Sequence, residues 1–231
     1  GAAAGSGSVP LFTNDTRKSL GWAIDAAEAG DGKLRLRVDR YGVPTNQYYT
    51  LQLGLTGLAY STTSPYNCPK AARVLIDAVK VISSMAFTLG EPGNAVLGLA
   101  KMAVGITNAS VRTYARSIAP SPGSLDPNNC DTWGWGYKNV FLAEHYLLTG
   151  DTNVLHGINE YTVGLAKGQS LYGTFGHGGA EPHADGSLHG SISWYGPVNS
   201  AGLVANLAIV MGRKCIVASG GVVHPEIDPA I

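Results

Sequence analysis

Histidines and carboxylates gather in the second half of the chain, where they could move protons. His177 and Asp185 lie in a segment rich in glycine and histidine, and Glu144 lies in a predicted helix. A histidine that faces a carboxylate transfers protons near neutral pH, which is the chemistry of many lyases and hydrolases. The alternative is that these are hydrogen-bonded structural side chains, because proximity in sequence is weak evidence of contact. Both interpretations stay open.

Metal and cofactor sites gain little support from residue spacing. The histidines form no His-x-x-x-His or Glu-x-x-His pair of the kind that zinc sites use on helices. Residues 126–131 cluster carboxylate and amide oxygens but lack the glycine and the closing glutamate of an EF-hand loop, which favours an ordinary Asx turn. No Gly-x-Ser-x-Gly elbow, Walker loop or Rossmann fingerprint occurs. We therefore expect no metal and no cofactor.

Three aromatic residues alternate with glycines just before a predicted helix. These residues, Trp133, Trp135 and Tyr137, would present open faces for stacking against a sugar or a peptide. Asn199 is added to the same candidate ligand-binding set. The alternative is packing between helices, because aromatic side chains fill cores more often than they bind ligands.

Charge composition argues against two classes of partner. Sixteen basic residues balance sixteen acidic ones, and charged residues make up only 14% of the chain without any run of Lys or Arg. Nucleic acid and anionic membranes both attract proteins through such basic patches. The apolar stretch 201–210 is too short to span a bilayer, which indicates a buried helix and not a transmembrane one.

Local sequence patterns predict the state of the cysteines and the first secondary-structure elements. Three cysteines without a Cys-x-x-Cys pair favour buried thiols, with one disulfide as the alternative. A helix capped by Asn14 or Asp15 is predicted to end at Gly30. Alternating residues over 33–38 and 49–53 then predict a β-hairpin.

Helices dominate the rest of the chain. Apolar periodicity predicts helices over 69–90, 94–105, 108–119, 137–148, 151–165 and 198–211. Gly150 ends one of them and Asp151 caps the next, which makes this pair the clearest helical hairpin. Segment 168–190 is a long loop. The helix over 198–211 is apolar on almost all sides and is therefore expected inside a larger assembly.

Several runs resemble a secreted bacterial family of unknown function that joins a PDZ-like module to an α/α toroid. They are Asp15-Thr-Arg-Lys-Ser-Leu-Gly-Trp-Ala-Ile24, Pro65-Tyr-Asn-Cys-Pro-Lys70, Trp135-Gly-Tyr-Lys-Asn-Val-Phe-Leu-Ala-Glu144, Gly168-Gln-Ser170, Gly173-Thr-Phe-Gly-His177 and Tyr195-Gly-Pro-Val-Asn199. Gln169, Gly173 and Phe175 also resemble, with Phe for Trp, a Gln-x-x-x-Gly-x-Trp pattern of terpenoid-cyclase toroids. A glutamine there would tie a helix end to the next turn.

This resemblance implies a mainly α fold in two parts. A small, incomplete PDZ-like α+β module would occupy 1–60, and toroid-like helical hairpins would occupy 66–231. We expect a partial copy that lacks the PDZ start and the toroid end. Residues 1–8 would be the processed end of a secreted or cell-envelope protein or, alternatively, a flexible linker. The expected function is binding or assembly, with a glycan or peptide ligand and a homo-oligomer or larger assembly. The alternative is a secreted polysaccharide lyase or hydrolase using a His/carboxylate pair.

Overall fold

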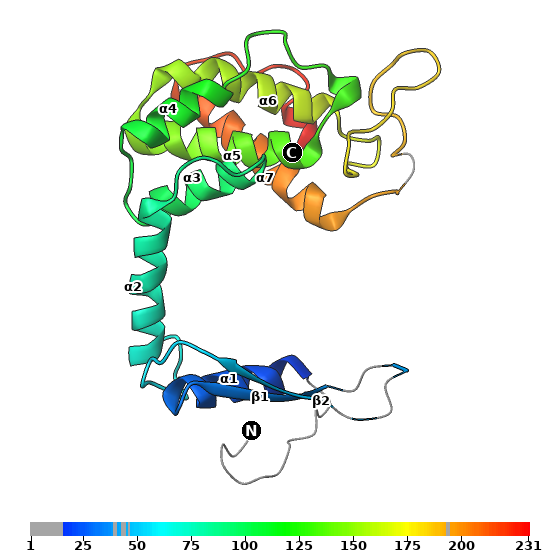
Figure 1. Ribbon diagram of the computed structural model, residues 1–231. Helices are drawn as coiled ribbons and strands as arrows, with labels where there is room; N and C mark the ends of the chain where they lie inside the picture. Colours follow the sequence, from blue (N-terminus) through cyan, green and yellow to red (C-terminus); the bar gives the residue numbers. More distant parts are fainter. Residues whose placement is uncertain (1–15, 39–40, 43–44, 46, 193–194) are drawn as a thin grey trace. The chain divides into compact units, whose positions relative to one another are not determined.

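The chain folds mainly into helices, with one small antiparallel sheet (Figure 1). A computed structural model describes residues 16–38, 41–42, 45, 47–192 and 195–231. The elements are α1 (Thr16–Ala29), β1 (Lys33–Val38), β2 (Gln47–Gln52), α2 (Pro69–Ser84), α3 (Gly93–Ala103), α4 (Ala109–Ile118), α5 (Thr132–Thr149), α6 (Leu155–Lys167) and α7 (Asn199–Ala218). The expected caps Asn14 and Asp15 lie outside the described residues.

The described part of the chain divides into two compact units between Val81 and Ile82, and this boundary falls inside α2. In the first unit β1 pairs with β2 in the register Lys33 to Gln52, which confirms the predicted hairpin. The buried Lys70 ammonium pairs with Asp25 and with Glu28, the latter at 2.7 Å, and so fixes the start of α2 to α1. Burial alone would lower the pKa of Lys70, but its hydrogen bonds to the two carboxylates and their negative charges outweigh burial and raise the pKa.

The end of α2 differs from the prediction, because the helix stops at Ser84 and not near Gly90. Lys101, which is buried, donates its ammonium hydrogens to the carbonyl oxygens of Ile82 and Ser83 at 2.8 and 3.2 Å. A cation at the last carbonyls of a helix satisfies groups that the helix itself leaves open. The helix therefore ends where a side chain from α3 caps it.

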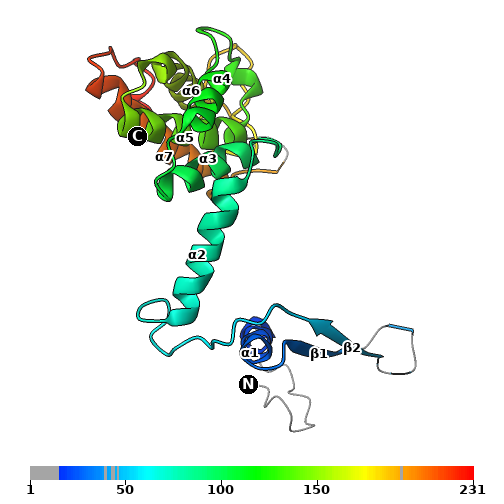
Figure 2. The ribbon, with the colours of Figure 1, turned by 60° about the vertical axis from the view of Figure 1, so that its left-hand side comes forward.

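Helices of the second unit lie in two layers: α3, α5 and α7 form one, and α4 and α6 cover it, as both ribbon views show (Figures 1 and 2). α5 and α7 run parallel, since Gly136 lies against Val204 and Ala143 accepts from Cys215 further along both helices. α6 runs antiparallel to them. The starts of α5 and α7 and the end of α6 consequently lie at one end of the unit.

A buried polar contact locks these three helices together. Asn139 on α5 donates through its amide nitrogen to Thr162 on α6 and to the Ala208 carbonyl on α7, each at 3.0 Å. Thr162 donates in turn to the Ile158 carbonyl at 2.6 Å. Gly212 lets α7 approach so closely that a Cβ atom there would lie 1.9 Å from the Thr162 oxygen. Register between the helices is thus fixed by polar groups as well as by apolar packing.

The prediction for the last helix is corrected in two respects, its length and its burial. α7 is longer than expected, and it is long and apolar enough to cross a bilayer by length and composition alone. It packs against α5 and α6, but only 39% of its most apolar window is buried, not nearly all of it. Leu203, Leu207, Val210 and Val217 are exposed along one side. Apolar periodicity alone could not separate the packed face from the open one.

Cysteines behave as the favoured interpretation predicts. Cys68, Cys130 and Cys215 are buried free thiols. Burial raises the pKa of Cys130 to about 12 and that of Cys215 to about 11. Cys68 differs, because the backbone N–H groups of Ser61 and Ala71 lower its pKa to about 7.

Candidate functional site

Four aromatic side chains gather at the end of the second unit where α5 and α7 begin. They are Trp133, Tyr137, His177 and Tyr195, and we call them the aromatic shelf. Asp131 positions the first of them: its carboxylate caps α5 by accepting from the Gly134 N–H at 2.9 Å. The backbone of Asp131 also forms an antiparallel bridge with Gly178, beside His177.

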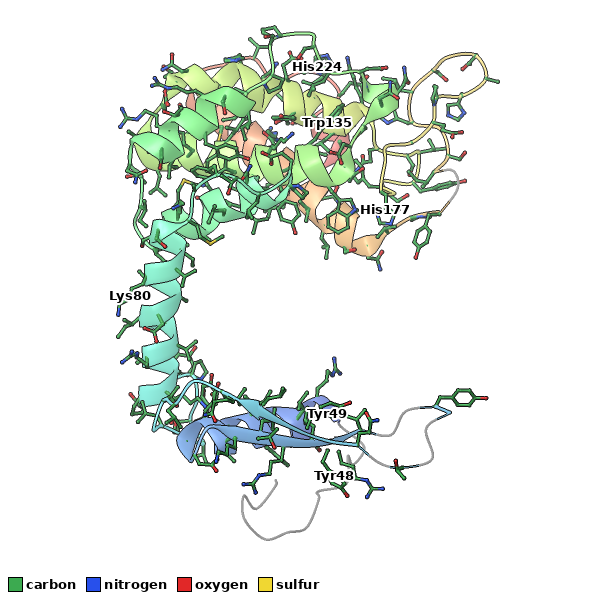
Figure 3. The ribbon with its side chains drawn as sticks, viewed as in Figure 1. Tyr48, Tyr49, Lys80, Trp135, His177 and His224 are labelled. Atoms are coloured by element: carbon green, nitrogen blue, oxygen red, sulfur yellow. The ribbon has the colours of Figure 1, made fainter. Side chains whose placement is uncertain are left out.

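Trp133 and Tyr137 share one face of α5 because they are four residues apart. Their rings stack with centroids 6.2 Å apart and planes at 16°. Trp135 lies two residues on, which turns it to the other side of the helix. It is only 9% exposed and packs on Tyr161 and Gly164, inside the helical unit (Figure 3). The predicted three-ring platform is therefore wrong for Trp135, which is a core residue.

His177 reaches the shelf from the long loop, at the edge of the unit (Figure 3). The Trp133 indole N–H donates to its Nδ1 at 2.9 Å, and the Tyr195 ring lies 5.2 Å away. Glycines on both sides let the loop pack tightly: a Cβ at Gly176 would lie 2.8 Å from Ile192, and one at Gly179 would lie 2.7 Å from Cys130. His177 is thus the single side chain that this tight stretch, 176–179, presents.

Glu144 and Asp185 do not join His177. Glu144 follows Trp133 by eleven positions on α5, which corresponds to about 16 Å along the helix axis. Asp185 instead accepts from the N–H and the hydroxyl of Ser187 at 2.9 and 2.7 Å, and these bonds lower its pKa. Among the described residues, no hydrogen bond or ion pair therefore joins His177 to either of these carboxylates.

Two other histidines contact carboxylates, and sequence reasoning missed both pairings. His145 lies 3.3 Å from Asp151, where both side chains are buried. His189 lies 3.1 Å from Glu226 and 2.8 Å from the Gln169 carbonyl, joining the loop to the C-terminal segment. Both are explained as structural contacts. No motif signals a contact between His189 and a residue 37 positions away.

Asn199 begins α7 as an exposed residue, four positions after Tyr195. The backbone before it is fixed, since the Val198 N–H donates to the Phe175 carbonyl at 2.8 Å. The sequence patterns assigned no binding role to Tyr195, which belongs only to the run 195–199 of the family resemblance. Among the described residues, no three His, Cys, Asp or Glu side chains gather as metal ligands would.

Gln169 acts as the local tie that its sequence pattern suggests. Its amide nitrogen lies 3.3 Å from the Gly173 carbonyl, 3.4 Å from the Asn206 side chain and 3.2 Å from the Ala230 carbonyl. These contacts join the end of α6 to the loop, to α7 and to the C-terminal segment. Phe175, buried in the core, anchors the stretch that leads to His177.

Comparisons with known proteins identify a family and no individual relative. A search of curated proteins and a search of solved structures each found no match. Residues 74–231 match the family described as Domain of unknown function (DUF6288), a range that covers more than half of the chain and the whole aromatic shelf. The chain therefore belongs to the DUF6288 family.

Proposed function

We propose that this chain is an extracellular or cell-envelope binding protein whose aromatic shelf holds a glycan. The observation that carries the proposal is the shelf itself: two half-buried, stacked rings from α5 meet two exposed rings from a loop. Tyr195 is 70% exposed there. Clusters of aromatic rings that remain partly open to solvent are common in ligand-binding sites.

Sugars fit this surface because their C–H faces stack on aromatic rings while their hydroxyls need polar partners. The shelf supplies both, since tyrosine and histidine rings each carry a polar edge. An open surface also suits a long polymer, which must enter and leave from the side. Because no carboxylate contacts His177 among the described residues, we favour binding over cleavage at this site.

The wider architecture is part of the same proposal. Parallel α5 and α7, with antiparallel α6 outside them, support a segment of an α/α toroid, in which inner helices run in one direction. The helix and hairpin of the first unit are compatible with a PDZ-like module. The extracellular or envelope location rests on the family resemblance.

Binding to insoluble polysaccharides tests the function. The full chain is mixed with cellulose, chitin or purified peptidoglycan, and the protein left in the supernatant is measured. We expect depletion by at least one of the three. Trp133→Ala should weaken that binding by about 1 to 3 kcal/mol if its ring stacks on the sugar.

Matched control variants distinguish binding at the aromatic shelf from nonspecific adsorption through exposed aromatic residues. Trp22 is an exposed tryptophan on α1, and Tyr172 is an exposed tyrosine in the same loop as His177. Trp22→Ala and Tyr172→Ala should bind like the wild type, whereas Tyr195→Ala should bind less. Equal losses in all four variants, or no depletion by any polysaccharide, would contradict the proposal.

Assembly with further copies is proposed separately from glycan binding. The open side of α7 carries the four exposed apolar residues named above, and the net charge of zero does not oppose association. Light scattering of the purified chain tests this. A monodisperse monomer would contradict it.

A further inference from the structure

We infer that Trp133 fixes the neutral His177 ring with its proton on Nε2, and that this N–H donates to an oxygen of a neutral sugar. The inference rests on the proposed function and names the ligand chemistry of the same site. It makes His177 a specificity residue and not only part of a stacking surface.

The tautomer follows from one hydrogen bond. An indole N–H is a donor and never an acceptor. The Trp133 nitrogen lies 2.9 Å from His177 Nδ1, so Nδ1 must accept with its lone pair. A neutral imidazole carries one proton, which therefore resides on Nε2. Trp133 thus determines which atom of His177 offers a hydrogen to a ligand.

The ring is held so that this hydrogen is available. Nδ1 is occupied by Trp133, and the Tyr195 ring packs against the imidazole with planes at 57°. The bridge between Asp131 and Gly178 fixes the backbone beside the ring. His177 is exposed, and within the described part of the chain no group hydrogen bonds to Nε2. A donor that is oriented before binding costs less entropy to use than a mobile one.

Charge around the shelf favours an uncharged sugar. None of the four shelf side chains carries a fixed positive charge. Of the charged residues nearest to the shelf in sequence, Asp131 precedes Trp133 by two positions and Lys138 directly follows Tyr137, so one negative and one positive charge balance there. With these charges balanced, an anionic sugar gains no net attraction, whereas the hydroxyl oxygens of a neutral sugar accept from Nε2–H.

Nitrogen-15 NMR of histidine-labelled full-length protein tests the tautomer without any ligand. At a pH where the ring is neutral, His177 should show a protonated Nε2 and an unprotonated Nδ1. Trp133→Phe keeps an aromatic ring but removes the indole N–H, so the two tautomers should then mix. A protonated Nδ1 in the wild type would overturn the inference even if the protein binds glycans.

Calorimetry with cellohexaose and chitohexaose, soluble forms of two of the polysaccharides above, tests the donor. We expect at least one to bind. His177→Phe should then weaken binding by about tenfold, the scale of one hydrogen bond. His177→Gln, whose amide nitrogen can reach the position of Nε2, should recover most of the loss.

Outcomes separate this inference from the proposed function. If Trp133→Ala abolishes binding but His177→Phe binds like the wild type, the shelf is a glycan site and the donor role is wrong. If polygalacturonate, an anionic polymer, binds more tightly than the neutral sugars, the inferred ligand class is wrong. If no glycan binds, the proposed function fails and the ligand inference fails with it.

Discussion

Gly212→Ala should destabilise the helical unit, against the usual effect of replacing a glycine within a helix. Gly212 lies within α7, and the added Cβ would sit 1.9 Å from Thr162 Oγ1 and 3.1 Å from Asn139 Nδ2. An ordinary contact needs about 3.4 Å, so α7 or α6 must move by about 1.5 Å. All three residues are buried, which leaves the side chains no open space to move into.

The expected magnitude follows from three effects. Overpacking a core typically costs about 1 to 3 kcal/mol. Displacing Thr162 also weakens its bond from Asn139, worth about 0.5 to 1.5 kcal/mol. Alanine is the better helix former by about 1 kcal/mol, which offsets part of this cost. The net loss in the free energy of unfolding should be about 1 to 3 kcal/mol.

Gly202→Ala is the matched control on the same helix. No atom lies within 4 Å of a Cβ at Gly202. It should therefore stabilise the protein by about 0.5 to 1 kcal/mol. Urea unfolding followed by circular dichroism measures both variants.

A double-mutant cycle tests the assigned contact. Thr162→Ala removes the atoms that the new methyl group would strike, so Gly212→Ala should cost less in that background. If Gly212→Ala stabilises the protein as much as Gly202→Ala, or if its cost is unchanged by Thr162→Ala, the close approach of α6 and α7 is wrong.

Three further outcomes are expected. Trp135→Ala should lower the free energy of unfolding by about 3 to 5 kcal/mol, since it empties a core position, whereas Trp133→Ala, at a half-buried position, should cost clearly less in the same urea assay. The Arg116 guanidinium holds the pKa of Asp151 well below its ordinary 3.8, so this stabilisation is complete above that value and is lost as the pH falls below it. Asp151→Asn should thus be less stable at neutral pH and lose less stability on acidification, and an equal acid slope in both proteins would count against the pairing. Buried Cys215, with a pKa of about 11, should resist iodoacetamide in the native protein and react in urea, as mass spectrometry would detect.

Local signals in the sequence were sufficient for most of the elements. The hairpin, the start of α2, the helices α3 and α4, and the presence of α5 and α6 follow from apolar periodicity and from residues with a defined role at helix ends. Gly150, with φ of 70°, ends α5 in the left-handed conformation that glycine adopts easily, and Asp151 caps the short turn that leads into α6. Such features depend on neighbours within a few positions, so the chain itself encodes them.

The aromatic site was predicted in part, and its error has a local cause. Gly134 and Gly136 are weak helix formers, so the sequence predicted the helix to begin at 137, whereas α5 begins at Thr132. In a strand-like alternation, Trp133 and Trp135 would lie on the same face. In the helix that forms, they point to different sides, and Trp133 lies on the same face as Tyr137. Recognition of Asp131 as a cap would have given the correct face.

The rest of the site was decided by tertiary structure alone. The loop that carries His177 and Tyr195 has no period and few apolar residues, so no sequence rule states where it returns to the helices. Contacts between Trp133 and His177 span 44 positions, and that between Gln169 and Ala230 spans 61. Hydrogen bonds over such distances depend on where the packed helices place their ends. The sequence therefore determined which side chains could bind a ligand, and only the packing of α5, α6 and α7 decided which of them meet.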